Sequence, residues 1–235
     1  MEDKIKFRAS FENGAFWEYY KDLERQFIEY LNYVPYLDGN ETTYSFRLAN
    51  LILSIGAHID SAFKEMTKYP KFSRKYPHLL KRDGTPKKLN IKDYNPLISE
   101  YELQRVSVDF KRLPERESVT PFSQYKIVND NVDTPEWWRV YNGIKHEFSE
   151  NFQKANLKNG RDALAGAFSL NVVHEPVLVR FTEHRLLLDR WKYLPITLYQ
   201  LETYLKNSRP ECIIETEVFF YDYRNGPQYN PVKEK

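Results

Sequence analysis

Apolar residues recur at helical spacing in two long stretches of the first third of the chain. The first stretch predicts a helix over residues 15–33 that ends before Pro35, and its apolar stripe consists of Phe16, Tyr20, Leu23, Phe27 and Tyr30. The second predicts a helix from Thr42 or Thr43 to about Thr67, with the stripe Leu48, Leu51, Ile52, Ile55, Ile59, Ala62, Phe63 and Met66. Each stripe covers one helical face, so we expect the two helices to share a core.

The spacing of apolar residues is no longer helical in two later segments. Residues 105–110 alternate between apolar and polar side chains, which predicts a half-buried strand. Residues 213–221 are rich in β-branched and aromatic side chains, which favours a second strand. We expect these two strands to pair as a small sheet beside the helices.

Three more helices are predicted in the second half of the chain, over residues 134–155, from Asn159 to just before Pro176, and over residues 186–206 with a bend or break at Pro195. Residues 163–167 are mostly small, so a neighbouring helix can approach closely there. The predicted fold class is a mainly α helical bundle with a small β element. Residues 1–235 are expected to form one domain, with a basic loop insertion near residues 68–92 and a C-terminal strand and tail after about residue 210.

Composition excludes several classes of site. No apolar run is long enough to span a bilayer, and the charged N-terminus lacks the apolar segment of a signal peptide, so a cytoplasmic protein without a membrane partner is expected. Cys212 is the only cysteine, which excludes an intrachain disulfide and is typical of a buried thiol. The pairs His174-Glu175 and Glu183-His184 lack metal-ligand spacing, and no Gly-rich phosphate loop is present. No metal and no cofactor are therefore predicted.

Positive charge is concentrated between the second predicted helix and the first predicted strand. This basic segment contains nine cations and one acid; the cations are Lys68, Lys71, Arg74, Lys75, Lys81, Arg82, Lys87, Lys88 and Lys92. Aromatic residues lie among the first of these cations, at Tyr69, Phe72 and Tyr76. One interpretation is a solvated loop, which is the usual role of a charge run. The other is a surface that binds RNA phosphates and stacks bases.

The predicted helix over residues 134–155 has a polar face whose side chains could take part in catalysis or binding. Thr134 can cap it, Pro135 suits its first position and Glu136 its first turn. At about 100° per residue, the stripe Trp137, Tyr141, Ile144, Phe148 and Phe152 faces the core. The residues on the other side are Arg139, Asn142, His146 and Glu150. These residues are expected to face solvent, a cleft or another subunit.

Three of these residue types can support metal-independent cleavage of RNA. Histidine can transfer protons near neutral pH, arginine can bind a phosphate and stabilise negative charge, and asparagine can orient either group. The alternative is a polar helix face with an incidental histidine. His58, on the flank of the second predicted helix, is interpreted as a surface histidine, although Ser61 and Glu65 lie at three and seven residues onward.

Arg139, six residues and then His146 on a late helix resemble the signature of the HEPN superfamily. Residues 45–56, followed by Asp60, Lys64 and Glu65, are similar to an earlier helix of that family. The chain departs from the pattern at Val140, where the family often has a polar residue, and its spacing is the longest that the signature allows.

The resemblance implies a HEPN-like bundle that acts as a metal-independent endoribonuclease, as in toxin or phage-defence modules. The implied catalytic residues are Arg139, Asn142 and His146, with Lys145 and the basic segment binding RNA. It also implies a homodimer that faces two such motifs across a shared cleft, and a protein partner such as an antitoxin. The alternative function is a non-catalytic HEPN-like module that binds a nucleotide or a protein.

Overall fold

The computed structural model describes residues 11–112, 117–128, 131–173 and 213–222. The helices are α1 (Phe11–Leu31), α2 (Phe46–Thr67), α3 (Pro70–Lys75), α4 (Asn95–Glu100), α5 (Glu136–His146), α6 (Phe148–Asn151) and α7 (Leu157–Val173). Short 3₁₀ helices span Asp38–Asn40, Pro77–Leu79, Leu103–Arg105 and Phe152–Lys154. The strands are β1 (Val108–Phe110), β2 (Glu117–Val119), β3 (Lys126–Val128), β4 (Asn131–Asp133), β5 (Ile213–Glu215) and β6 (Phe219–Asp222). The chain is thus mainly helical, as predicted, and the predicted helix over residues 186–206 lies outside the described residues.

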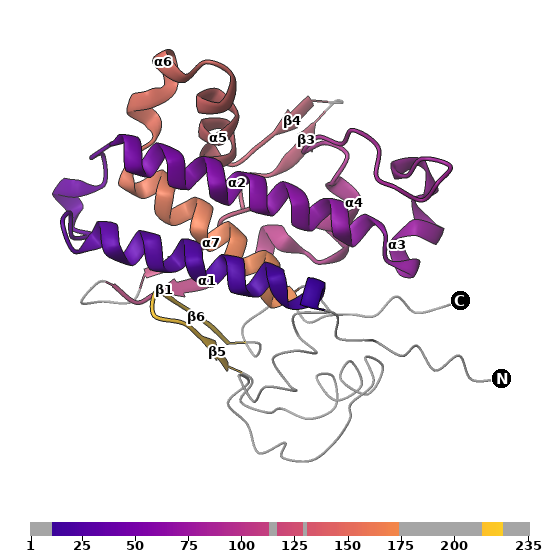
Figure 1. Ribbon diagram of the computed structural model, residues 1–235, viewed down its shortest axis with the longest axis horizontal. Coiled ribbons are helices and arrows are strands. Elements are labelled where there is room, and N and C mark those ends of the chain that lie inside the picture. Colours follow the sequence, from indigo (N-terminus) through magenta and orange to yellow (C-terminus); the bar gives the residue numbers. More distant parts are fainter. Residues whose placement is uncertain (1–10, 113–116, 129–130, 174–212, 223–235) are drawn as a thin grey trace.

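The helical core is built from α1, α2, α5 and α7. Figure 1 shows α1 and α2 side by side, with α5 and α6 on the opposite side of α2 from α1. The predicted apolar stripes of α1 and α2 are buried in this core, except that Phe16 is only partly buried against it. The start of α2 differs from the prediction, because Ser45 rather than Thr42 or Thr43 is its cap, and the Ser45 hydroxyl accepts a hydrogen bond from the Leu48 N–H at 3.1 Å.

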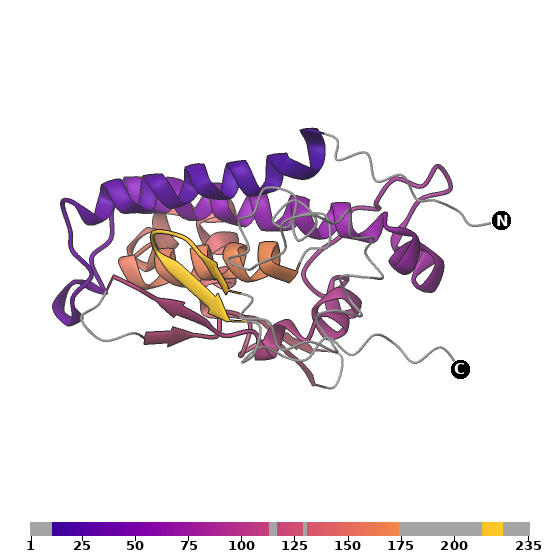
Figure 2. The ribbon, with the colours of Figure 1, turned by 90° about the horizontal axis from the view of Figure 1, so that it is seen from below.

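A four-stranded antiparallel sheet in the order β2-β1-β6-β5 lies against one side of the helices, next to α1 and α7 (Figure 1, Figure 2). Asp109 pairs with Phe220 and Phe110 with Phe219, so the predicted pairing of the two segments is confirmed. The prediction of one strand over residues 213–221 is wrong, because this segment folds back on itself as the antiparallel hairpin β5–β6, and only β6 pairs with β1. The Phe219 ring stacks on Phe168 of α7 at 5.6 Å between ring centroids, which joins the sheet to the helical core. A separate hairpin, β3–β4, precedes α5.

Arg161 of α7 is a buried cation that ties the sheet and the α1–α2 connection to the helices. Its side chain is 5% exposed, and its guanidinium lies 2.7 Å from a Glu117 carboxylate oxygen and 2.8 Å from one of Asp162. The same group lies 5.0 Å from the centre of the Tyr36 ring and 5.8 Å from that of Phe110. Removal of both carboxylates would leave this buried charge uncompensated, which is strongly destabilising.

Helix α5 rests on glycines of both neighbouring helices. A Cβ atom at Gly56 of α2 would lie 2.3 Å from Tyr141 Cδ2, and one at Gly166 of α7 would lie 3.0 Å from Trp137 Cζ2. The expectation that residues 163–167 allow a close approach is confirmed at Gly166. The Tyr141 ring occupies the space that a side chain at Gly56 would need, so glycine is required there, and the Trp137 ring leaves little room for a side chain at Gly166.

We expect Gly56→Ala to lower the free energy of unfolding by about 1–3 kcal/mol, because the new methyl group overlaps the Tyr141 ring. Urea denaturation followed by circular dichroism measures this change. Gly39→Ala is the matched control, since a Cβ atom there would have nothing within 4 Å. Equal stability of the two variants would contradict the proposed contact.

Candidate functional site

The polar face of α5 begins at a helix start that differs from the predicted one. Thr134 does not cap the helix; the Glu136 N–H instead donates to the Gln124 side chain at 3.0 Å, and Pro135 occupies the cap position. Trp137 anchors the first turn by donating its indole N–H to the Pro121 carbonyl at 2.7 Å. Contacts with a distant loop therefore set the start of α5.

Arg139 lies on the exposed face, as predicted, but its guanidinium is directed toward the start of α5. Its Nη1 donates to an Asp133 carboxylate oxygen at 3.0 Å and to the Thr134 carbonyl. The side chains of Arg139 and Asp133 are 52% and 65% exposed, and an ion pair this exposed stabilises a protein by at most about 1 kcal/mol. The guanidinium can therefore leave Asp133 for a stronger anion.

Asn142 and Lys145 lie one turn apart on the flank of the same face. The half-buried Asn142 donates its amide to the Trp138 carbonyl at 3.2 Å. The exposed Lys145 ammonium lies 3.2 Å from the Tyr141 hydroxyl oxygen and 5.2 Å from the centre of that ring. Both donors are thus held by α5 itself, next to the histidine that ends the helix.

His146 is exposed and is the last residue of α5. Within the part of the chain that the structure describes, its imidazole has no hydrogen bond and no ion pair. Arg139 is seven residues earlier, about 10 Å along the helix axis. Because the guanidinium turns toward the opposite end, the two groups do not converge within one chain.

The prediction of a single helix over residues 134–155 is wrong after His146. Glu147 leaves the helical region, with φ −138° and ψ 65°, and α6 starts with a different phase. Consequently Phe148, predicted in the buried stripe, is exposed, and Phe152 is half-buried, whereas Trp137, Tyr141 and Ile144 are buried as predicted.

The turn after α5 brings two unpredicted polar residues to the His146 end of the helix. The Asn151 side chain lies against Gly143, where a Cβ atom would approach Asn151 Cγ to 2.7 Å. Asn151 donates to the Glu147 carbonyl at 3.1 Å and accepts from the Lys154 ammonium at 3.0 Å. Gly143 within the polar face was the signal in the sequence for this close approach. The next helix also starts earlier than predicted: Asn156, not Asn159, caps α7, and its side-chain oxygen accepts from the Asn159 N–H at 3.0 Å.

An aromatic cluster follows directly after His146 and was not predicted. It consists of Tyr44, Phe46, Phe148 and Phe152, which come from the start of α2, from α6 and from the 3₁₀ helix after α6. The Phe46 side chain is among the most exposed large apolar ones of the described chain, at 68%. The cluster was not predicted because the apolar stripe of the predicted helix placed Phe148 and Phe152 in the core.

The basic segment follows α2 at the surface, and it is not a loop throughout, because it contains α3 and the 3₁₀ helix Pro77–Leu79. Lys68 pairs with Glu65 at 2.6 Å and Lys75 with Glu100 at 2.8 Å. The remaining cations whose side chains the structure describes are exposed: Arg74, Lys81, Arg82, Lys87, Lys88 and Lys92. The Lys81 N–H donates to the Thr85 carbonyl at 2.7 Å, which closes a tight loop that presents this charge to solvent.

The aromatic residues of the basic segment face inward. Phe72 is buried in the core, and Tyr69 and Tyr76 are partly buried against it. The Phe72 ring is therefore not available to stack on a base. The segment starts at the C-terminal end of α2, whereas the aromatic cluster contacts the N-terminal end. The 22 residues of α2 separate these ends by about 33 Å.

His58 is buried, so its interpretation as a surface histidine is wrong. It is 3% exposed, its Nε2 lies 3.4 Å from the Asn171 amide nitrogen, and the rings of Phe16 and Tyr19 cover it. Burial lowers the pKa of His58 to about 4, so the imidazole is neutral at physiological pH. His58 is buried because α1 packs over this part of α2.

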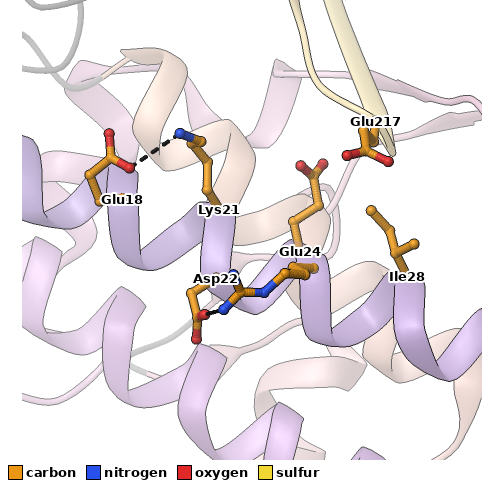
Figure 3. A pocket seen from close by; sticks show the side chains of 7 residues that line it. Glu18, Lys21, Asp22, Glu24, Ile28 and Glu217 are labelled. Carbon is orange, nitrogen blue, oxygen red and sulfur yellow. Dashed lines mark hydrogen bonds and ion pairs between the residues drawn. The ribbon is translucent and has the colours of Figure 1, made fainter.

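A hollow of about 320 Å³ lies between α1 and the β5–β6 hairpin (Figure 3); its lining residues are Glu18, Lys21, Asp22, Glu24, Arg25, Ile28 and Glu217. Burial raises the pKa of Glu24, and one of its oxygens accepts hydrogen bonds from the Tyr20 hydroxyl at 3.0 Å, the Thr216 hydroxyl and the Val218 N–H at 3.2 Å. Glu24 thus holds the hairpin turn on α1. None of the predicted site residues lines this hollow.

Within the described ranges, no group of three or more His, Cys, Asp or Glu side chains could hold a metal ion. No described helix combines the length and the apolar character needed to cross a membrane. Cys212, His174 and His184 lie outside the described residues. Comparison of the chain with protein-family models, curated proteins and solved structures gives no match.

Stability is expected to fall in acid because of His58. The unfolded state binds a proton below a pKa of about 6.5 and the folded state only below about 4, so the free energy of unfolding decreases as the pH drops between these values. The full difference is on the order of 3 kcal/mol. Denaturant titrations of the wild type and His58→Gln from pH 7.5 to 4 measure it. The wild type should lose more stability than the variant, and parallel curves would contradict the neutral buried histidine.

Proposed function

We propose that this chain is a metal-independent endoribonuclease of the HEPN type, with His146 as the proton-transfer residue. The observation that supports this most is the state of His146. It is solvent-exposed, has no partner among the described residues, and lies next to Lys145 and one turn from Asn142. A histidine in this state can exchange protons with a bound substrate.

In the proposed reaction a ribose 2′-hydroxyl attacks its own phosphate while neutral His146 accepts the hydroxyl proton. The new P–O2′ bond forms as the P–O5′ bond breaks, and the leaving 5′ oxygen takes a proton from water. Arg139 and Lys145 would stabilise the negative charge that develops on the phosphate. RNA that extends away from this centre would contact the basic segment through its phosphates.

The separation of Arg139 from His146 supports a homodimeric form of this site. Two α5 helices packed antiparallel, one from each copy, would bring the Arg139 end of one helix to the His146 end of the other. Such a two-fold arrangement presents the same face twice. In this arrangement the scissile phosphate would compete with Asp133 for the Arg139 guanidinium.

A second candidate is a non-catalytic HEPN-like module that binds a nucleotide or a protein partner, such as an antitoxin in a toxin or defence module. The observation that favours it is the hydrogen bonding of Arg139 to Asp133 and Thr134, which occupies the guanidinium. RNA binding without cleavage would support this alternative.

The wild-type protein is expected to cleave single-stranded RNA in the presence of EDTA, and His146→Ala to reduce the rate by at least about 100-fold, because proton transfer contributes factors of this size. Gel analysis of a labelled RNA measures the rate. Tyr33→Ala is the control, since Tyr33 is also exposed but belongs neither to the polar face of α5, nor to the basic segment, nor to the aromatic cluster. Intact RNA after incubation with the wild type would refute cleavage.

Mixing the inactive variants Arg139→Ala and His146→Ala is expected to restore cleavage. If each site takes Arg139 from one copy and His146 from the other, half of the re-formed dimers are mixed and each has one intact site, giving about a quarter of the wild-type rate. The measurement is the initial rate after subunit exchange. No recovery, with exchange verified by mass spectrometry, would show that the site is not shared between copies.

A further inference from the structure

The aromatic cluster presents nearly parallel rings at the surface. The rings of Phe46 and Phe148 are inclined by only 3°, with centroids 6.2 Å apart, and Phe152 contacts both at 4.5 and 5.3 Å with inclinations of 25°. Tyr44 meets Phe152 edge to face at 5.3 Å. Three aligned phenyl rings thus form a small platform, of which Phe46 and Phe148 are exposed.

The backbone holds this platform in place. Tyr44 forms a β-bridge with Asn156, and the Leu157 N–H donates to the Thr43 carbonyl at 2.9 Å. Phe46 is the first residue of α2, whose cap is Ser45. Because both sides of the cluster are fixed before any ligand arrives, little ordering of the platform would oppose binding.

The platform is adjacent to the proposed proton-transfer residue. Phe148 follows His146 by two residues, so their Cα atoms are at most about 7 Å apart. One nucleotide can span such a distance. Lys154, whose ammonium donates to Asn151 at 3.0 Å, adds a cation to the same turn.

Charge near the platform is balanced. Lys145 and Lys154 are accompanied by the exposed acids Glu147 and Glu150, and Arg47 is paired with Glu29. A surface of this kind gains little from phosphate contacts. Its affinity would come from stacking, because every base has a flat face that matches an exposed aromatic ring.

We propose that the aromatic cluster stacks unpaired bases of an RNA strand and thereby places the adjoining phosphate beside His146. This inference rests on the single-stranded RNA substrate proposed above, and it assigns the group that holds the bases of that strand. The cluster and the basic segment then have separate roles: stacking at one end of α2 and salt-sensitive phosphate binding at the other.

The test uses the full-length His146→Ala protein, so that binding is measured without cleavage. Fluorescence anisotropy gives the Kd for an oligoadenosine of about 12 nucleotides and for an abasic ribose-phosphate strand of equal length, at several salt concentrations. Adding Phe46→Ala is expected to weaken oligoadenosine binding about tenfold and to leave the abasic strand unchanged. Adding Phe46→Leu should weaken it similarly, because leucine keeps apolar area but has no ring.

Salt dependence separates stacking from charge. Phe46→Ala should leave the slope of log Kd against log salt unchanged, whereas neutralising Lys81, Arg82, Lys87 and Lys88 should make that slope shallower. Tyr33→Ala is the matched control: Tyr33 is 81% exposed, follows α1 in the α1–α2 connection and is not a member of the cluster. It should not change either Kd.

Three results of Phe46→Ala would overturn the proposal. The Kd for oligoadenosine could stay unchanged, the affinity for both strands could fall equally, or the protein could sediment at a lower mass than the protein with Phe46. The last would assign the cluster to contact between copies of the chain. Cleavage by the wild type is scored separately. Cleavage without a Phe46 effect would refute only the stacking, and a base-dependent effect without cleavage would refute only the catalysis.

Discussion

The close contact of two aromatic rings with two glycines determines where α5 lies, and most other features of the candidate site depend on it. Tyr141 covers Gly56 of α2, and Trp137 covers Gly166 of α7. Helices approach this closely only where side chains leave room, and the rings then fill that room at the density of a protein interior. The consequence is a fixed orientation of α5. Its core face is sealed, and Arg139 and His146 are exposed on the other side.

A second constraint joins the sheet to this helical core. Arg161 is buried among carboxylates and aromatic rings from the sheet, from α7 and from the α1–α2 connection. Burial of a cation is tolerated because each guanidinium nitrogen lies close to a carboxylate and the aromatic faces are attracted to the charge. At the other edge of the sheet, the carboxylate of Glu24 has a similar role, because it accepts hydrogen bonds from the β5–β6 turn. Both groups hold segments that are far apart in the sequence.

The turn at Glu147 connects the packing of α5 to the proposed chemistry. By ending α5 at His146, it leaves the imidazole at a helix terminus and directs Phe148 and Phe152 toward Phe46. The same turn places Asn151 over Gly143. A continuous helix would have buried the two phenylalanines instead. The proposed catalytic and stacking groups are therefore consequences of one local break in helical geometry.

Periodicity alone determined a large part of this protein. The stripes of α1 and α2, the exposed face that contains Arg139 and His146, and the strand character of residues 108–110 and 219–221 follow from short-range patterns, because each element must bury one face. Tertiary structure decided what such patterns do not contain. His58 became buried because α1 covers it, Gln124 replaced Thr134 at the start of α5, and Arg139 turned to Asp133. Each outcome depends on which groups the folded chain places within bonding distance, and helical spacing holds no information about that.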